Sequence, residues 1–328
     1  MSINAVSLFS GCGGFDIGAQ RNGINILWAN DVNKNVQLTY QRNFPQTEFR
    51  LGDIRQIAKS SIPEADLLIG CYPCQGFSNA AWRKWKNRDR DLRANQDNYL
   101  FLEFTKSIPY VNPKFVFIEN VPGLKSAENG YFFKAQEEAL IGSGYTVYSS
   151  KLKAHEFGVP QTRQRIFFVG VRNDLQYEYK FPAAQHGPGK LPCQTMHDTI
   201  LHLPEWPTGD YLETQFHGHY LTRNRKKAWD ECSYTIVADC DHVTLHPMGA
   251  PMKKIGKDQW VLQGTTNRRL SWRECSILQS FDETFEPAGN LTAKYLQIGN
   301  AVPPRVAELL VKPVVDWIKQ QNGSIDPT

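Results

Sequence analysis

The chain has 328 residues, of which 41% are hydrophobic and 21% charged, with 37 Lys and Arg against 33 Asp and Glu. This length suits one large domain or two of ordinary size, and the composition supplies a sizeable core and excludes a disordered tail. The apolar runs are too short to cross a bilayer and the first residues lack the pattern of a secretory signal, so we expect a cytoplasmic protein with no membrane partner. Seven scattered cysteines favour reduced thiols over a disulfide scaffold. The formal charge of +4 permits a nucleic-acid partner without proving one.

Seven short apolar runs, rich in β-branched and aromatic residues, precede residue 175. They are bounded by Gly, Pro, Asn or Asp, which is typical of buried strands in a parallel sheet. Amphipathic segments such as 100–108 and 132–141 lie between them and predict helices. The alternation predicts an α/β fold whose parallel sheet is covered by helices on both faces. The predicted strands are 6–9, 24–29, 48–51, 66–70, 115–118, 145–148 and 166–169.

The pattern changes near residue 181. From there to about residue 267, Pro, Gly, His and short Thr/Tyr/Val runs dominate, which predicts a smaller, irregular and β-rich second domain. Helical patterning returns after residue 268, and 304–319 predicts an amphipathic helix with Pro at its start. We therefore expect two domains, one formed by 1–180 together with 290–328 and the other by 181–289.

Polar or reactive residues follow five successive predicted strands. The first strand leads into glycines at 11, 13 and 14, the second into Asp31, and the third into Asp53. The fourth leads into a Cys-x-x-Cys pair at 71 and 74, and the fifth into Glu119. Ligands of open parallel sheets bind outside the carboxyl ends of the strands, so this convergence predicts one site.

The glycines allow a sharp turn and let a ligand approach bare backbone at a helix N-terminus. A dinucleotide fingerprint needs a further glycine where Asp16 stands, which weakens that interpretation. Asp31 is placed to accept hydrogen bonds from ribose hydroxyls, and Asp53 from an adenine amino group. A nucleoside cofactor without a pyrophosphate fits this set; the alternative is a glycine turn beside two solvated carboxylates.

Cys71 and Cys74 have three candidate chemistries. A structural zinc needs four ligands, and the residues at 232, 240, 242 and 246 match no common zinc spacing, so we expect no metal. A dithiol redox site is the second alternative, because Pro73 lies between the thiols. In the third, Cys74 alone is a nucleophile in a loop that Pro73 stiffens, and it faces the carboxyl group of Glu119. A thiol at a strand end beside a nucleoside cofactor suits this covalent catalysis.

Basic residues gather in three segments. Residues 82–93 carry six positive and two negative charges with two tryptophans interleaved, and 222–227 form a second cluster. The third, 161–165, holds two arginines that would share one side of an extended chain. Single charge runs are usually solvated faces, but three around one predicted cleft indicate a polyanionic partner.

Six short sequence blocks stand out along the chain. They are FSGCGG at 9–14, GDI at 52–54, PCQGFS at 73–78, ENV at 119–121, QTRQR at 161–165 and GNAVP at 299–303. These blocks match a known family in the family's order, and the chain resembles the bacterial DNA (cytosine-5) methyltransferases over essentially its whole length. A seventh segment, RLSWREC at 269–275, resembles the block before the last of the six.

The resemblance implies a Rossmann-like, mostly parallel sheet of the S-adenosylmethionine-dependent methyltransferase fold. It also implies S-adenosyl-L-methionine as methyl donor, S-adenosyl-L-homocysteine as product, and target recognition by 181–289.

The resemblance assigns roles residue by residue. Cys74 would attack carbon 6 of cytosine, Glu119 would act at N3, and Arg165, with Arg163 beside it, would hold the O2 edge. Asp31 stands where the family usually has Glu. The implied cofactor contacts are Phe9, Gly11, Cys12, Gly13, Gly14, Asp31, Val32, Asp53, Ile54, Leu100, Asn300 and Val302. The implied DNA contacts are Gln75, Ser78, Arg83, Lys84, Arg88, Arg223, Asn224 and Arg225.

The expected substrate is a cytosine flipped out of a short site in double-stranded DNA. The recognition segment resembles those of family members that act on short GC-rich sites such as GGCC. A restriction-modification setting is implied, with a cognate endonuclease that acts on the same site without a stable complex. We expect a monomer in the bacterial cytoplasm. A tRNA cytosine-5 methyltransferase on the same fold and a non-catalytic DNA-binding relative are the alternatives. For the recognition segment, packing of the small domain is the alternative role.

Overall fold

The computed structural model describes residues 2–73, 77 and 92–323. The chain divides into two compact units. The first unit comprises Met1–Leu152, Gln164–Ala183 and Ala307–Thr328, and the second comprises Lys153–Arg163 and Ala184–Val306. No helix among the described residues is both long and apolar enough to span a membrane. The predicted division into catalytic and recognition domains is a statement about function and stays a prediction.

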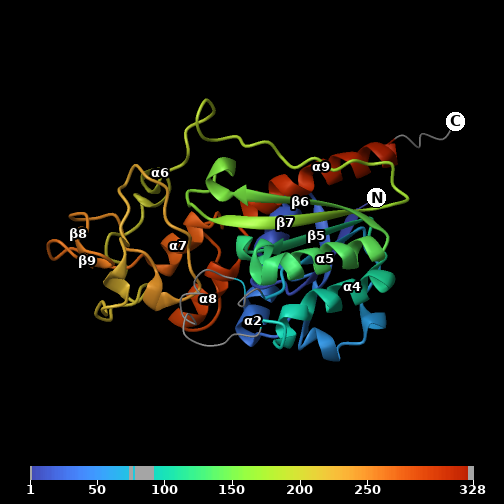
Figure 1. Ribbon diagram of the computed structural model, residues 1–328, viewed down its shortest axis with the longest axis horizontal. Helices are drawn as coiled ribbons and strands as arrows, with labels where there is room; N and C mark the ends of the chain where they lie inside the picture. The colour runs from blue at the N-terminus through green and yellow to red at the C-terminus, as the bar shows by residue number, and fades with distance from the viewer. Residues whose placement is uncertain (1, 74–76, 78–91, 324–328) are drawn as a thin grey trace. The chain divides into compact units, whose positions relative to one another are not determined.

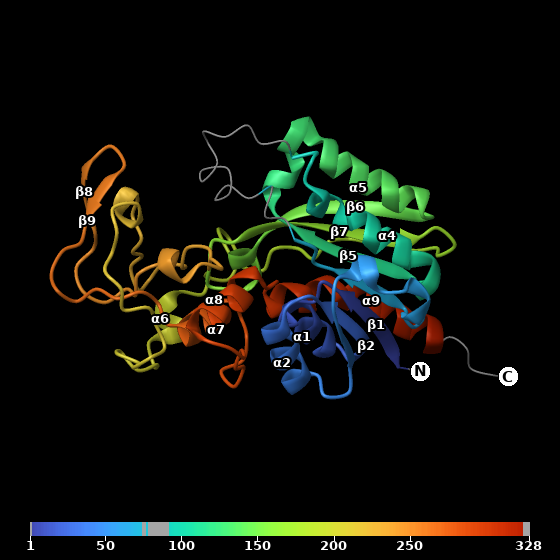
Figure 2. The ribbon, with the colours of Figure 1, turned by 90° about the horizontal axis from the view of Figure 1, so that it is seen from below.

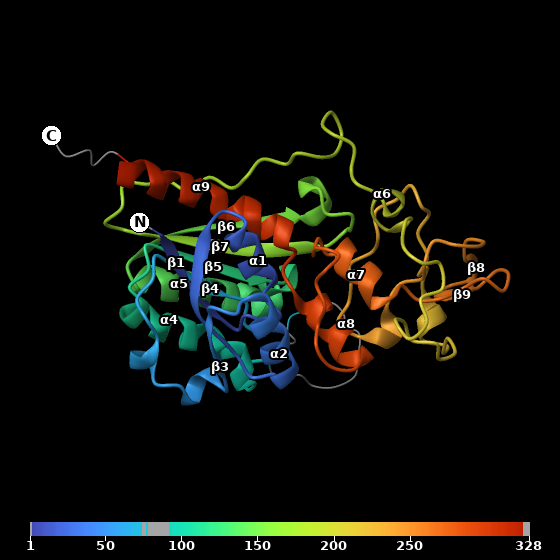
Figure 3. The same cartoon turned by 180° about the vertical axis from the view of Figure 1, so that it is seen from behind.

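The first unit is built on a seven-stranded sheet with the order β3-β2-β1-β4-β5-β7-β6 (Figures 1 and 3). The pairs β3–β2, β2–β1, β1–β4 and β4–β5 are parallel, whereas β7 runs antiparallel to β5. The mostly parallel sheet is therefore confirmed. Its strands are β1 (Ile3–Leu8), β2 (Ile24–Asp31), β3 (Glu48–Leu51), β4 (Leu67–Gly70), β5 (Phe115–Asn120), β6 (Tyr145–Lys153) and β7 (Gln164–Arg172).

All seven predicted apolar runs form strands, but they are not equally buried. β4 and β5 are buried throughout, whereas β3 lies at the edge of the sheet and is largely exposed. β3 pairs with β2 only and has no strand on its other side, which leaves more of it exposed to solvent.

Helices cover both faces of this sheet, as Figure 2 shows for α4 and α5 on one side and α1 and α2 on the other. β5 explains the arrangement, because its successive side chains point to opposite faces. Phe117 packs against Phe15 of α1, with ring centroids 5.8 Å apart. Val116 belongs instead to the cluster that contains Phe104 of α4 and Phe132 of α5. The helices are α1 (Gly14–Gln20), α2 (Lys34–Asn43), α4 (Leu100–Val111), α5 (Tyr131–Gly142) and α9 (Pro304–Gly323).

The second unit contains little regular structure (Figure 1). Its core joins residues of α6 (Met196–Ile200), α7 (Trp272–Leu278) and α8 (Leu291–Asn300). Within its described residues the only strand pair is the hairpin of β8 (Lys253–Gly256) and β9 (Gln259–Val261). The expectation of an irregular module is confirmed, and the expectation that it is β-rich is wrong. Apart from the hairpin, its described residues pair only in isolated bridges, such as Lys226 with Leu245 and Leu245 with Arg269.

A buried ion pair organises the start of α7 in the second unit. The Arg268 guanidinium donates to both carboxylate oxygens of Glu274, at 2.8 and 2.7 Å. Glu274 also accepts from the backbone N–H of Ser271, whose hydroxyl caps the helix in return. The RLSWREC segment thus contains a capping box formed by Ser271 and Glu274, and Arg268, just before the segment, pairs with the same carboxylate.

Candidate cofactor and catalytic site

The chain turns sharply where β1 ends, because three residues adopt left-handed backbone conformations. Phe9, Gly11 and Gly13 have φ of 55°, 53° and 85°. A Cβ at Gly13 would lie 2.5 Å from the Phe44 ring, so no larger residue fits there. A Cβ at Gly11 would meet nothing within 4 Å. The loop is therefore closed on the Gly13 side and leaves open space at Gly11, which suits a ligand that approaches the backbone.

Asp31, at the end of β2, is tied to this loop. Its carboxylate accepts from the backbone N–H of Gly11 at 3.1 Å and from that of Asn33 at 2.9 Å. Burial raises the pKa of Asp31, and these backbone hydrogen bonds oppose the rise. Next to it, Val32 is 65% exposed and available for contact. The structure thus brings together the glycine loop and the predicted ribose acceptor.

Asn30 fastens the end of β2 to the segment that follows β3. Its side-chain amide donates to the carbonyl oxygens of Arg50 and Gly52, both at 2.8 Å. This holds the ends of two neighbouring parallel strands together and brings Asp53 to the same edge of the sheet. Ile54, which follows Asp53, is 1% exposed and anchors the turn in the core.

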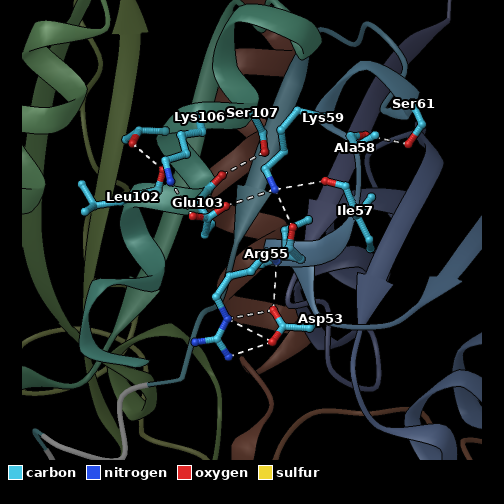
Figure 4. Close-up of polar contacts among 12 residues, drawn as sticks. Asp53, Arg55, Ile57, Ala58, Lys59, Ser61, Leu102, Glu103, Lys106 and Ser107 are labelled. Carbon is cyan, nitrogen blue, oxygen red and sulfur yellow. Dashed lines mark hydrogen bonds and ion pairs between the residues drawn. The ribbon is translucent and has the colours of Figure 1, made fainter. Parts of the chain in front are cut away.

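The Asp53 carboxylate is held by Arg55 (Figure 4). The Arg55 Nε lies 3.0 Å from both carboxylate oxygens, and Nη2 lies 2.8 Å from Oδ2. Nη1 reaches Asp97 Oδ1 at 3.1 Å. The hydrogen bond from Arg55 lowers the pKa of Asp53. Sequence reasoning missed Arg55 and Asp97; the only signal was an arginine two positions after a strand-end aspartate.

These residues fit an adenosine group without a pyrophosphate. The open backbone at Gly11 provides a cradle, and the Asp31 and Asp53 carboxylates are acceptors for hydroxyl and amino donors. Leu100, at the start of α4, is 6% exposed and belongs to the first unit as well. Among the described residues, the one group of three potential metal ligands is Asp239, Cys240 and Asp241, in the second unit.

Glu119 and Arg165 lie on the adjacent antiparallel strands β5 and β7. Glu119 is opposite Phe167, and Arg165 is two residues away on the same face. The Arg165 Nε lies 2.8 Å from Glu119 Oε1, with side-chain exposures of 17% and 7%. The structure therefore brings two of the predicted catalytic groups into contact in a largely buried position.

Cys74 lies outside the described residues, as do Gln75, Ser78, Arg83, Lys84 and Arg88. The chain on either side of Cys74 is described. β4 leads to Cys71 beside β5, with Gly70 opposite Ile118, the residue before Glu119. Phe77 packs against Phe132, and its carbonyl oxygen is so close to Gly123 that a Cβ there would lie 2.0 Å from it. Both flanks of Cys74 thus neighbour the strand that carries Glu119 and the segment after it.

Arg163 has a different environment from Arg165. It is 1% exposed within the second unit, and its Nη1 donates to the carbonyl oxygens of Gly299 at 3.0 Å and Ile236 at 3.3 Å. These contacts favour a structural role and weigh against the predicted contact with the base. The hydrogen bond to Gly299 links Arg163 of the QTRQR block to the GNAVP block. Of the predicted cofactor contacts in that block, Asn300 is exposed and Val302 buried, and both stay predictions.

The predicted DNA-reading residues of the second unit also separate. Arg223 is exposed and Asn224 is half-buried. Arg225 is 3% exposed and donates to the carbonyl oxygens of Tyr220 and His242, both at 3.0 Å. Its guanidinium also stacks 4.6 Å from the centre of the Tyr220 ring. Arg225 therefore stabilises the unit, a correction to its predicted role at the base edge, whereas Arg223 is positioned on the surface.

Solved structures share this fold. The chain superposes on the Entamoeba histolytica methyltransferase EhMeth with a TM-score of 0.69 at 19% identity, covering 97% of this chain and 99% of that one. For the S. pombe Dnmt2 methyltransferase the TM-score is 0.70 at 17% identity, covering 96% and 99%. The open, mostly parallel sheet is that of the S-adenosylmethionine-dependent methyltransferases.

Sequence relatives narrow the class. Residues 3–316 match the family described as C-5 cytosine-specific DNA methylase. Type II methyltransferase M.BsuRI of Bacillus subtilis is 35% identical over 358 residues, which cover 96% of this chain and 80% of that protein. Type II methyltransferase M.MthTI of Methanothermobacter thermautotrophicus is 33% identical, covering 96% and 97%. The chain belongs to the C-5 cytosine-specific DNA methylase family and is a DNA (cytosine-5) methyltransferase.

Proposed function

We propose that the enzyme transfers the methyl group of S-adenosyl-L-methionine to carbon 5 of a flipped-out cytosine in a short site of duplex DNA. The observation that carries the proposal is the ion pair between Glu119 and Arg165. Glu119 lies on β5, the strand beside β4, and β4 leads toward Cys74. It would supply a carboxyl group to the same reaction as the Cys74 thiol, at the sheet whose other strand ends carry the proposed nucleoside contacts.

The glycine loop and two carboxylates would hold the cofactor. Asp31 would accept from the ribose hydroxyls, Asp53 from the adenine amino group, and the open backbone at Gly11 would face the rest of the molecule. When bound, the cofactor supplies an electrophilic methyl group on a sulfonium. Phe9, Cys12, Gly14, Val32, Ile54, Leu100, Asn300 and Val302 complete the proposed contacts.

The chain's own residues would perform the activation of the base. Attack of the Cys74 thiolate on carbon 6 forms an S–C bond and moves electron density to carbon 5, which takes the methyl group. Glu119 would share a proton with N3, so that the charge developing in the ring is neutralised there. Arg165 would keep the Glu119 carboxyl group oriented. A water molecule would take the carbon 5 proton, and the electron pair left behind restores the ring double bond as the S–C bond breaks and releases the thiolate.

This chemistry requires the cytosine to leave the helix, at a cost of a few kcal/mol. The basic segment after Cys74 would hold the phosphates, and contacts from the second unit would read the bases. Arg223 and its neighbour Asn224 are the proposed readers, because Arg pairs bidentately with guanine in the major groove. Gln75, Ser78, Arg83, Lys84 and Arg88 are the other proposed DNA contacts.

The similarity to type II methyltransferases supports a type II restriction-modification setting, in which the enzyme would protect host DNA from a cognate endonuclease that acts on the same site. We propose a short GC-rich site resembling GGCC, a monomeric enzyme and a cytoplasmic location. The recognition domain would be 181–289, with catalysis and cofactor binding in 1–180 and 290–328.

Incubation with labelled cofactor tests the proposal. Duplex DNA with the site should acquire the label, and bisulfite sequencing of DNA from cells that express the enzyme should map the cytosine. Label that enters tRNA and not DNA would instead establish the alternative substrate. Absence of transfer to either would leave the non-catalytic alternative and contradict the proposal.

A further inference from the structure

We propose that Arg55 is a positioning residue for adenine recognition: it fixes the Asp53 carboxylate and thereby selects a 6-amino purine in the cofactor. The inference rests on the proposed function for the identity of the cofactor. It goes beyond that function by naming a residue that touches no part of the cofactor and determines which base is accepted.

The geometry of the pair supports a fixed orientation. Asp53 receives three N–H groups from Arg55, namely the backbone N–H at 2.9 Å, Nε at 3.0 Å from both oxygens, and Nη2 at 2.8 Å (Figure 4). Backbone and side chain of one residue thus hold both carboxylate oxygens, so the carboxylate cannot rotate without breaking hydrogen bonds. A side-on pairing of this kind is the most directional that an arginine makes.

A further donor would share the carboxylate with Arg55. Two carboxylate oxygens offer about four acceptor positions, and the three N–H groups of Arg55 make four contacts with them, because Nε is shared between both oxygens. One position becomes free for a further donor when Nε bonds to a single oxygen. An exocyclic amino group is a single donor of the required kind. A 6-oxo group presents an acceptor to the same carboxylate and would be repelled. Because Arg55 lowers the pKa of Asp53, the carboxylate stays ionised and acts only as an acceptor.

Arg55 also connects two segments that would line the adenine site. Its Nη1 pairs with Asp97 at 3.1 Å, and Asp97 lies on the short helix η3 (Gln96–Tyr99) that leads directly into Leu100. The guanidinium therefore spans from the segment after β3 to the start of α4.

Lys59 makes a separate connection for the backbone of the same segment. Its Nζ donates to the carbonyl oxygens of Ile54 and Ile57 and lies 3.1 Å from Glu103 Oε2 on α4 (Figure 4). The backbone is thus held to α4 without the Arg55 side chain. Loss of that side chain should leave the loop in place and leave Asp53 held only by the backbone N–H of residue 55, so that its carboxylate is less firmly oriented.

The expected effect is moderate, because the pair is partly exposed. The side chains of Arg55 and Asp53 are 41% and 29% exposed. Ion pairs at such positions contribute little by attraction alone, so the effect should appear in selectivity and be about fivefold to tenfold. Turnover at saturating cofactor should stay within about twofold, because the reacting atoms lie elsewhere.

The test measures binding of two product analogues to the full-length enzyme by isothermal titration calorimetry. S-adenosyl-L-homocysteine carries the 6-amino group, and S-inosyl-L-homocysteine carries a 6-oxo group in its place. The variants are Arg55→Met and Arg55→Lys, with Arg50→Met as control. Arg50 is an exposed arginine of β3 whose side chain makes no ion pair within the described part of the chain.

The ratio of the two dissociation constants is the deciding quantity. We expect it to fall in Arg55→Met, to fall less in Arg55→Lys, and to be unchanged in Arg50→Met, with thermal unfolding of all variants as in the wild type. An equal loss of affinity for both ligands, with the ratio preserved, would mean that Arg55 only supports the fold and would overturn the proposal. If Arg55→Met does not fold, the ratio in Arg55→Lys decides alone. A wild-type enzyme that binds neither ligand would contradict the proposed cofactor itself, whereas failure of the ratio test leaves it intact.

Discussion

Arg165 reaches across from β7 to place its Nε 2.8 Å from the carboxylate of Glu119 on β5. The two residues are 46 positions apart in the sequence and become diagonal neighbours only because β7 runs antiparallel to β5. The pairing places a positive charge against the carboxyl group at the end of the central strands.

Removal of either member of this pair should impair the chemical step. We expect Glu119→Gln to lower kcat by about 10² to 10³, since it loses the group that shares a proton with N3. Arg165→Met should lower kcat by about 10-fold to 10², because the carboxyl group loses its orientation. Single-turnover methylation at saturating DNA measures both. Arg172→Met, on the same strand but paired with Asp174, serves as control and should keep normal turnover.

Unchanged single-turnover rates in Glu119→Gln would contradict the role of this carboxyl group. A rate loss in Arg165→Met that is accompanied by an equal loss in Arg172→Met would mean that disruption of β7, and not of the ion pair, is responsible.

Asp31 should determine cofactor affinity. The Asp31→Ala variant loses a charged acceptor for the ribose and a contact to Gly11, so the Kd for S-adenosyl-L-homocysteine should rise about 10- to 100-fold. Asp31→Glu should lose less, because the carboxylate remains on a longer side chain. Equilibrium binding without DNA measures the effect. An affinity that is unchanged in Asp31→Ala would remove Asp31 from the cofactor site.

Asp16 should make stability depend on pH between about 4 and 6. It is fully buried on α1 and accepts a hydrogen bond from the Tyr40 hydroxyl at 2.7 Å. Burial raises the pKa of Asp16 from 3.8 to about 6. The folded protein thus binds this proton more tightly than the unfolded chain, so the stabilisation is complete below about pH 4 and is lost as the pH rises through 6.

A shift of this size corresponds to about 3 kcal/mol of unfolding free energy across the window. In Asp16→Asn the decline should be shallower than in the wild type, as measured by urea unfolding at several pH values. Asp258→Asn, at an exposed turn of the β8–β9 hairpin, should follow the wild-type curve. Parallel curves for Asp16→Asn and the wild type would show that this carboxyl group does not titrate in the window.

Substitution of Arg225 should affect stability, whereas substitution of Arg223 should affect DNA binding, although the two residues lie two positions apart. Arg225→Met removes two hydrogen bonds from a buried guanidinium, so it should destabilise the protein by about 2 to 4 kcal/mol. Arg223→Met should leave stability unchanged and weaken DNA binding, with a salt slope lower by about 1 if it contacts a phosphate. Urea unfolding and binding at several salt concentrations measure the two quantities. Equal destabilisation by both would contradict the separation.

The fold of the first unit could be predicted from the sequence because its signals are local. Short apolar runs such as 115–118 identify strands and so place Asp31 and Glu119 at strand ends. Ligands of open parallel sheets bind at the carboxyl ends of the strands, which makes both residues candidates for a site. The antiparallel direction of β7 could not be predicted, because strand direction depends on pairing between segments far apart in the chain.

The second unit was harder to predict for a physical reason. Beside its apolar core it contains buried polar contacts, such as Arg268 with Glu274 and arginines that donate to backbone carbonyls. A sequence does not show whether an arginine is exposed or buried. The sequence therefore predicts contacts with the DNA substrate for Arg163 and Arg225, which the structure buries. Arg55 was missed for the converse reason, because a surface arginine beside an aspartate carries no pattern of its own.

Covalent trapping by a duplex with 5-fluorocytosine at the target position tests the proposed chemistry most directly. Fluorine cannot leave as a cation, so elimination stops after methyl transfer and the S–C bond persists. We expect a stable enzyme–DNA adduct that peptide mapping assigns to Cys74, formed equally by Cys71→Ser and not by Cys74→Ser. The absence of an adduct at a site that the enzyme methylates with ordinary cytosine, or an adduct on any residue other than Cys74, would contradict it.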